Sequence, residues 1–78
     1  MNTLDLSFLG EKWPSGIVAR TSIKEFTGGM ISEKTMANLD SNGEGPDRFT
    51  IGRKVAYKVD VLIAWLEQRS IVNGSEEI

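Results

Sequence analysis

The spacing of apolar residues changes several times along this chain, and each change predicts an element of secondary structure. The apolar run of residues 17–19 is typical of a short strand. Directly after it, Ser22 and Glu25 have the Ser-x-x-Glu form of a capping box, in which the hydroxyl and the carboxylate satisfy free amides at a helix start. A short first helix is therefore expected here, with Ile23 and Phe26 as its buried stripe.

A second helix is expected between two glycine-containing turns. The glycine pair at residues 28–29 supplies the left-handed or open backbone that ends the first helix. Ser32 is then placed to accept from the amides of the next turn, and the helix should fade by residues 40–42. Met36 and Leu39, three positions apart, predict the buried face of this helix.

The opposite face of this second helix suits the major groove of DNA. Its members are small or polar and none is acidic: Lys34, Thr35, Ala37, Asn38 and Ser41. The two acids of the helix, Glu33 and Asp40, are expected to lie toward its edge. Such a face can enter a major groove without electrostatic penalty. The alternative interpretation is an ordinary solvated helix surface.

Alternation of apolar and polar residues then predicts a β-hairpin. All four apolar side chains share one face if Ile51 lies opposite Val55 and Phe49 opposite Tyr57, which leaves residues 52–54 as a three-residue loop.

The hairpin segment contains no carboxylate from residue 48 to residue 58. Its cations are Arg48, Arg53, Lys54 and Lys58. An arginine at a protruding tip can enter a narrow minor groove, and neighbouring cations can contact phosphates. The alternative is that these charges only keep the hairpin soluble and unpaired.

A last helix follows the hairpin with almost no loop. Leu62, Trp65 and Leu66 recur at spacings of three and four, which predicts a core-facing stripe, and Asp60 in the first turn favours the helix dipole. Arg69, beyond this stripe, is expected either in solvent or at a phosphate.

Composition excludes several classes of chemistry. The 78 residues allow one domain with a small core, and they include no cysteine and no histidine. Disulfides, zinc sites built from thiolate or imidazole, and nucleophiles activated by a histidine base are thereby excluded. We therefore expect no enzymatic activity, no metal and no cofactor. Tyr57 could suggest a recombinase nucleophile, but it is expected to face the core.

The overall charge argues against a general polyanion binder. The formal net charge is -2 and the isoelectric point is near 5.0. Some of the acids, however, lie toward the two ends of the chain, at Asp5, Glu76 and Glu77. No segment is long and apolar enough to span a bilayer, and the N-terminus lacks the features of a signal peptide. We expect a cytoplasmic, nucleoid-associated protein with no membrane partner and no small-molecule substrate.

Three motifs together resemble the excisionase and AlpA-type proteins of the MerR-like winged-helix DNA-binding group. They are the run from Gly28 to Leu39, the Gly-x-Gly-Pro turn at residues 43–46, and residues 51–57 followed by Asp-x-Leu-x-x-Trp at residues 60–65. The resemblance covers roughly residues 17–69. It implies an α+β winged helix-turn-helix with three short helices and a two-stranded β-hairpin wing, to which residues 17–19 add a short strand.

The weak apolar periodicity of residues 1–16 and the acidic C-terminal end predict a division of the chain, and the resemblance implies a set of DNA contacts. Residues 17–70 would form the DNA-binding domain, residues 1–16 a flexible arm whose Phe8, Leu9 and Trp13 could dock on it, and residues 71–78 a disordered acidic tail. The second helix would supply Lys34, Thr35 and Asn38 to the major groove, and the wing would supply Arg53 and Lys54 to the minor groove or backbone.

Within that group the expected function is architectural. Excisionases bind double-stranded DNA at adjacent sites in several copies, bend it, and direct an integrase or other recombinase toward excision. The alternative is an AlpA-type transcriptional regulator of mobile-element genes. A further alternative leaves DNA out and takes the chain as a winged-helix module for protein contact through Phe8, Trp13 and the acidic C-terminus.

Overall fold

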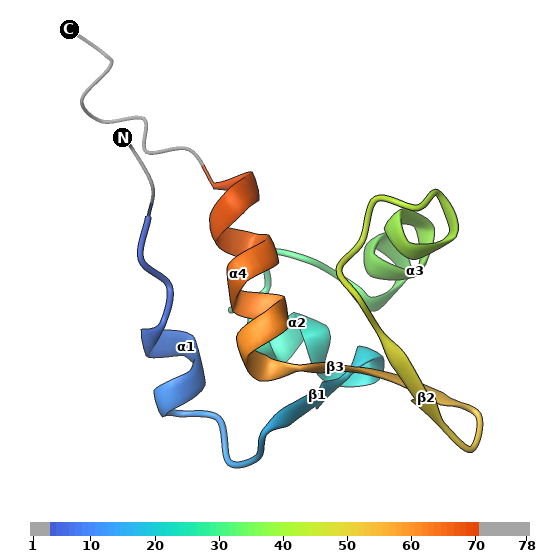
Figure 1. Cartoon of the computed structure of the whole chain (residues 1–78), viewed down its shortest axis with the longest axis horizontal. Helices are drawn as coiled ribbons and strands as arrows, with labels where there is room; N and C mark the ends of the chain where they lie inside the picture. The colour runs from blue at the N-terminus through green and yellow to red at the C-terminus, as the bar shows by residue number, and fades with distance from the viewer. Residues whose placement is uncertain (1–3, 71–78) are drawn as a thin grey trace, which may run out of the picture.

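The computed structural model describes residues 4–70, and in this part of the chain helices and strands combine in an α+β arrangement (Figure 1). The elements are α1 (Phe8–Glu11), β1 (Ile17–Ala19), the 3-10 turn η1 (Arg20–Ser22), α2 (Ile23–Phe26), α3 (Glu33–Ser41), β2 (Phe49–Ile51), β3 (Lys54–Lys58) and α4 (Val59–Arg69). The α+β class and the strand at residues 17–19 are confirmed. The expected count of three helices is wrong for the described residues, because α1 adds a fourth.

The sheet has three antiparallel strands in the order β1-β3-β2. Its central strand pairs with β1 through Val18 opposite Tyr57, and both side chains are fully buried. Cross-strand partners lie on the same face of a sheet. This pair therefore defines the face that turns toward the helices.

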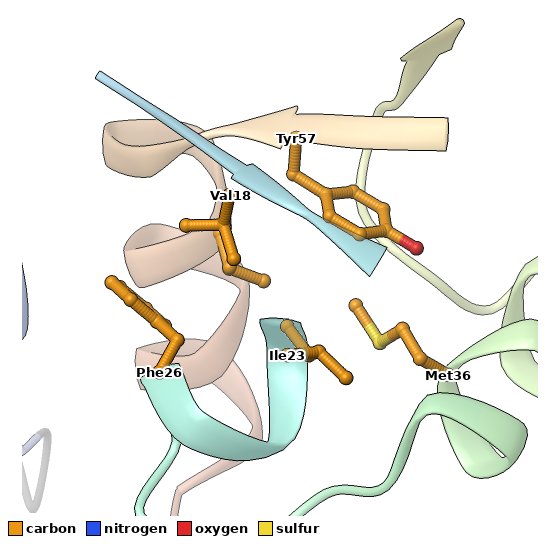
Figure 2. Packing of buried hydrophobic residues seen from close by; sticks show 6 residues of the cluster. Val18, Ile23, Phe26, Met36 and Tyr57 are labelled. Atoms are coloured by element: carbon orange, nitrogen blue, oxygen red, sulfur yellow. The ribbon is translucent and has the colours of Figure 1, made fainter. Parts of the chain in front are cut away.

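The core forms where this face meets α2, α3 and α4. Figure 2 shows Val18 and Tyr57 pointing from the sheet toward Ile23 and Phe26 of α2, with Met36 of α3 beside them. Leu62 of α4 completes the cluster, and each of these six side chains is at most 4% exposed. Full burial of an aliphatic or aromatic side chain contributes about 1.5 to 3 kcal/mol, so this small cluster is the main source of stability. The predicted burial of Ile23, Phe26 and Met36 is thus confirmed, whereas Leu39 is half-buried against this cluster.

The predicted hairpin register is wrong by one position. The observed pairs are Phe49 with Ala56, Thr50 with Val55, and Ile51 with Lys54. The loop therefore has two residues, Gly52 and Arg53. Gly52 has φ +63°, and the described residues include no other residue type with positive φ, which fits a type II′ turn. Turn geometry and the docking of Tyr57 beside Val18 set the register, rather than the segregation of all apolar side chains.

The first helix begins where expected but without a capping box. Ser22 makes no side-chain capping bond, and its φ of -105° and ψ of 7° differ from the extended backbone of an N-cap. The 3-10 turn η1 runs directly into α2, so the chain is already coiled at that point. The predicted end is confirmed, since Gly28 and Gly29 both have positive φ and the Gly29 amide donates to the Lys24 carbonyl at 2.8 Å.

Part of the segment expected to be a loose arm packs on the domain. Leu9 and Trp13 contact the core cluster, and the Trp13 ring meets Phe26 edge-on with 5.1 Å between ring centroids. The Trp13 indole N–H also donates to the Ile17 carbonyl at 2.9 Å. Phe8, by contrast, is 53% exposed. The expected acidic tail, residues 71–78, lies outside the described residues.

Helix α4 packs against the sheet and contributes Leu62 to the core cluster. Leu62 is fully buried, whereas Trp65 and Leu66 are half-buried. The Trp65 indole N–H donates to the Glu44 carbonyl at 3.0 Å, which fastens the loop after α3 to this helix. No helix in residues 4–70 has the length and apolar character needed to cross a membrane.

Candidate nucleic-acid interface

The two segments predicted to contact DNA lie at the same end of the described molecule. Figure 1 shows α3 and the tip of the β2–β3 hairpin at one end of the longest axis and α1 at the other. A polar helix face and a cationic hairpin are thereby brought into one region, although they are separated in sequence by the loop of residues 42–48.

Helix α3 begins and ends as its sequence predicts. The Ser32 hydroxyl accepts from the Thr35 amide at 3.1 Å, and the helix ends at Ser41. Met36 is fully buried and Leu39 is half-buried against the core. The side of the helix away from these two residues is therefore exposed to solvent.

The predicted contact residues on α3 are not equivalent. Lys34 and Asn38 are exposed, and no hydrogen bond joins either side chain to another described residue. The Thr35 hydroxyl bonds with the Ser32 hydroxyl at 3.0 Å, and the Ser41 hydroxyl donates to the Asn38 carbonyl at 3.1 Å. Ala37 is half-buried. Among the described residues, Lys34 and Asn38 thus keep all of their side-chain hydrogen-bonding groups free, whereas the Thr35 and Ser41 hydroxyls each make one hydrogen bond within the protein.

Asp40, expected at the edge of the helix, is buried instead, with only 4% of its surface exposed. Its Oδ2 accepts from Arg20 Nη2 at 2.7 Å and from the Tyr57 hydroxyl at 2.6 Å. Arg20 Nε also donates to the Tyr57 hydroxyl oxygen at 3.2 Å. A buried carboxylate is stable only when it is paired and hydrogen-bonded, and Arg20 and Tyr57 supply both conditions. The prediction that Asp40 lies toward the edge of the helix is therefore wrong.

This closed network changes the ionisation of its members. Burial, followed by the hydrogen bond to Asp40, raises the pKa of Tyr57 to about 12. The hydrogen bonds with Tyr57 and Asp40 raise the pKa of the Arg20 guanidinium above its usual value. At neutral pH the phenol is thus a hydrogen-bond donor and the guanidinium is charged. The network joins η1, α3 and β3, so it fixes α3 relative to the strand that leads out of the hairpin.

The loop after α3 closes over the same carboxylate. The Asp40 Oδ1 atom is buried without a hydrogen-bond partner among the described residues, and a Cβ built on Gly45 would collide with it. Gly43, two positions earlier, has φ +76°. The Gly-x-Gly-Pro turn therefore requires glycine at residue 43 for its backbone conformation and at residue 45 for close approach.

The hairpin presents its charges to solvent. Arg48, Arg53, Lys54 and Lys58 are all exposed. Within residues 4–70 the recorded ion pair is the one between Arg20 and Asp40, so none of the four hairpin cations is paired with a described carboxylate. Arg69 differs from them, since its guanidinium lies 4.9 Å from the centroid of the Trp65 ring in a cation–π contact.

A second surface feature is an apolar groove of about 1000 Å³. It is lined by α1, the turn after α2, and the C-terminal half of α4, and it also includes Thr35 and Leu39 of α3. Phe8 and Met30 stand at this groove with 53% and 83% of their surface exposed. No group of three or more side chains suited to hold a metal ion occurs among the described residues.

Sequence reasoning missed the Arg20–Asp40–Tyr57 network, although a signal was available. Asp40 follows the buried Met36 by four positions, and residues four apart lie on the same face of a helix. Its burial required a cationic partner, and Arg20 was not assigned any role.

Comparisons of the chain with protein-family models, curated proteins and solved structures give no match.

Proposed function

We propose that this protein is a sequence-specific DNA-binding protein of the winged-helix type, with α3 in the major groove and the β2–β3 hairpin as a wing on the minor groove or backbone. The observation that carries the proposal is the hairpin, whose four exposed cations have no carboxylate partner among the described residues. Arg53 and Lys54 lie at the protruding tip, and Arg48 and Lys58 lie at the base of the hairpin. Such unpaired cations match a phosphate backbone.

The exposed face of α3 supports the same function. Lys34 and Asn38 are exposed on α3, and this helix lies at the end of the molecule where the hairpin lies. An asparagine can pair with an adenine edge in a major groove, and a lysine can contact guanine or phosphate. Asp40, the acid that would oppose such an approach, is buried and paired with Arg20. The charge of Asp40 is therefore neutralised inside the protein, and the exposed acids nearest to this face in residues 4–70 are Glu33 in the first turn of α3 and Glu44 and Asp47 in the loop that follows the helix.

The test is DNA binding as a function of salt. If the hairpin neutralises about four phosphates, the log-log dependence of affinity on salt should have a slope near -3.6, at about -0.9 for each phosphate. Arg53→Ala should weaken binding and reduce the magnitude of this slope by about 0.9. The matched control is Lys12→Ala, which removes the same charge at the C-cap of α1, at the other end of the molecule. Equal effects of the two substitutions, or no salt-dependent binding to DNA from the protein's own locus, would contradict the proposal.

We propose that the complex of this protein with DNA has an architectural role, as in excisionases. Its partners would be an integrase and further copies of the chain. The competing role is transcriptional regulation of the AlpA type. An excision assay with the neighbouring integrase, run beside a promoter reporter, separates the two roles. Stimulated excision without a reporter response supports the architectural role, and the reverse result supports the regulator.

The apolar groove favours a second candidate function, protein contact without DNA. Phe8, one of the residues expected to serve such contact, is exposed at the groove, whereas Trp13 packs on Phe26. Exposed apolar surface around a hollow is common at protein-binding sites. This function predicts that Phe8→Ser abolishes partner binding while Arg53→Ala leaves it unchanged.

A further inference from the structure

Ile51 occupies an unusual position at the tip of the hairpin. Its side chain is 63% exposed, it pairs across the hairpin with Lys54, and it directly precedes the Gly52–Arg53 loop. It is a large aliphatic residue beside two exposed cations, Lys54 across the hairpin and Arg53 in the loop.

The fold does not use this side chain for packing. Val18 and Tyr57 define the face of the sheet that turns to the core, and Ile51 belongs to the opposite face, with Phe49 and Ala56. Ile51 is absent from the core cluster and from the residues packed against it. Strand formation alone would be served equally well by a β-branched polar residue such as the neighbouring Thr50.

The surroundings of Ile51 match the chemistry of the minor groove. The floor and walls of that groove present base edges and deoxyribose carbons, and its rims carry phosphates. Arg53 and Lys54 provide charge for the rims, while Ile51 offers an apolar surface beside them. Minor-groove proteins commonly place aliphatic side chains against this apolar interior.

We propose that Ile51 is an apolar DNA contact, which enters the minor groove beside Arg53 and packs on the deoxyribose walls. This inference rests on the proposed function, since it requires that the hairpin approaches DNA. It adds a contribution to affinity that comes from burial of apolar surface and does not depend on release of counterions.

The experiment compares Ile51→Thr with Ile17→Thr. Both changes replace an exposed isoleucine on the same sheet face by a β-branched polar residue, but Ile17 lies on β1 and pairs with Lys58 rather than with the tip. Ile51→Thr should weaken DNA binding about tenfold and leave the salt slope at the wild-type value. Ile17→Thr should bind as the wild type does. Far-ultraviolet circular dichroism and thermal unfolding would establish that both variants are folded.

The possible outcomes separate this inference from the proposed function. Wild-type affinity for Ile51→Thr, while Arg53→Ala still reduces the salt slope, overturns the role of Ile51 alone. A reduced salt slope for Ile51→Thr also overturns it, because the substitution would then act through the cations. Absence of salt-dependent binding by the wild type overturns the proposed function itself.

A second measurement tests whether Ile51 contacts the minor groove of DNA. Replacing guanine by inosine removes only the amino group that G·C pairs present in the minor groove. The replacement, made across the bound site, should change wild-type affinity more than that of Ile51→Thr. An equal change in the two proteins would overturn the assignment of Ile51 to the minor groove.

Discussion

Asp40 joins three elements through one carboxylate oxygen. The cost of removing a carboxylate from water is offset here by two short hydrogen bonds, one of them from the Arg20 guanidinium. Arg20 keeps 22% of its side chain exposed, so its charge remains partly solvated while the carboxylate is almost fully enclosed. The pair therefore positions η1 and α3 more than it adds net stability.

Asp40→Asn is expected to lower the free energy of unfolding by about 2 to 4 kcal/mol. The substitution removes the negative charge beside Arg20, and if the amide oxygen keeps the contacts with Arg20 and Tyr57, the amide NH2 lies buried at the position of Oδ1 without a partner among the described residues. Urea unfolding at neutral pH measures the change. Asp47→Asn, at an exposed position, should shift the value by about 0.5 kcal/mol or less. Equal stability of both variants would show that the network is not structural.

The raised pKa of Tyr57 predicts that the folded protein loses stability at alkaline pH. Its folded-state pKa is about 12, against about 10 in the unfolded chain, so between these values the unfolded state has lost the proton and the folded state retains it. Stability from this group is complete below pH 10 and falls as pH rises to 12, by about 2 to 3 kcal/mol. Thermal unfolding across this range should show a steeper decline for the wild type than for Tyr57→Phe. Parallel curves would contradict the prediction.

At the scale of elements, glycine positions decide the turn at the hairpin tip and the shape of the loop that joins α3 to the hairpin. Gly52, with φ +63°, allows a two-residue turn, and such turns match the twist of the flanking strands. Gly45 allows the loop after α3 to press on Asp40. Between Ser41 and Phe49 the chain turns from a helix to a strand, and the Trp65 indole of α4 holds the Glu44 carbonyl in this loop.

Gly45→Ala should destabilise the protein by about 1 to 3 kcal/mol. The new methyl group would collide with Asp40 Oδ1, and the loop or the carboxylate would have to move. Gly16→Ala is the matched control, because a methyl group there meets nothing within 4 Å. That control should be neutral or slightly stabilising, since alanine restricts the unfolded chain. Urea unfolding compares the two, and a stable Gly45→Ala protein would contradict the close approach.

At the scale of the molecule, the central strand β3 links the two segments proposed to meet DNA. One end of β3 leaves the hairpin tip, and its Tyr57 is bonded to Asp40 on α3. The helix and the hairpin are thus held by one rigid connection, and they would meet a duplex with a fixed separation. Such an arrangement favours recognition of a site over sliding contact with any sequence.

Asn38→Ala is expected to change the preference among DNA sites more than the overall affinity. An amide that pairs with an adenine edge contributes about 1 to 3 kcal/mol of discrimination, and loss of the amide removes it. Binding to the preferred site and to variants with single base-pair changes measures the effect. Lys34→Ala serves as a comparison on the same helix face. An equal loss on all sequences would make Asn38 a phosphate contact instead.

Local sequence determined the elements of this protein. The spacing of Ile23, Phe26 and Met36 placed the buried faces of two helices, Ser32 marked a helix start, and the glycine pair at residues 28–29 marked a helix end. The location of α2, α3, the hairpin and α4 could be predicted, because caps, turns and periodicity act between residues that are close in sequence. The exposed cations of the hairpin followed from the same pattern.

Only the tertiary structure decided the hairpin register, the burial of Asp40 and the docking of Trp13. Each depends on a partner distant in sequence: Val18 beside Tyr57, Arg20 beside Asp40, and Phe26 beside Trp13. A shift of one residue reverses which face of a strand is buried, and a carboxylate enters a core only when its counter-charge is delivered there. Long-range contacts therefore placed Ile51 on the surface and Asp40 inside, whereas the sequence pattern predicted Ile51 on one shared apolar face of the hairpin and Asp40 toward the edge of its helix.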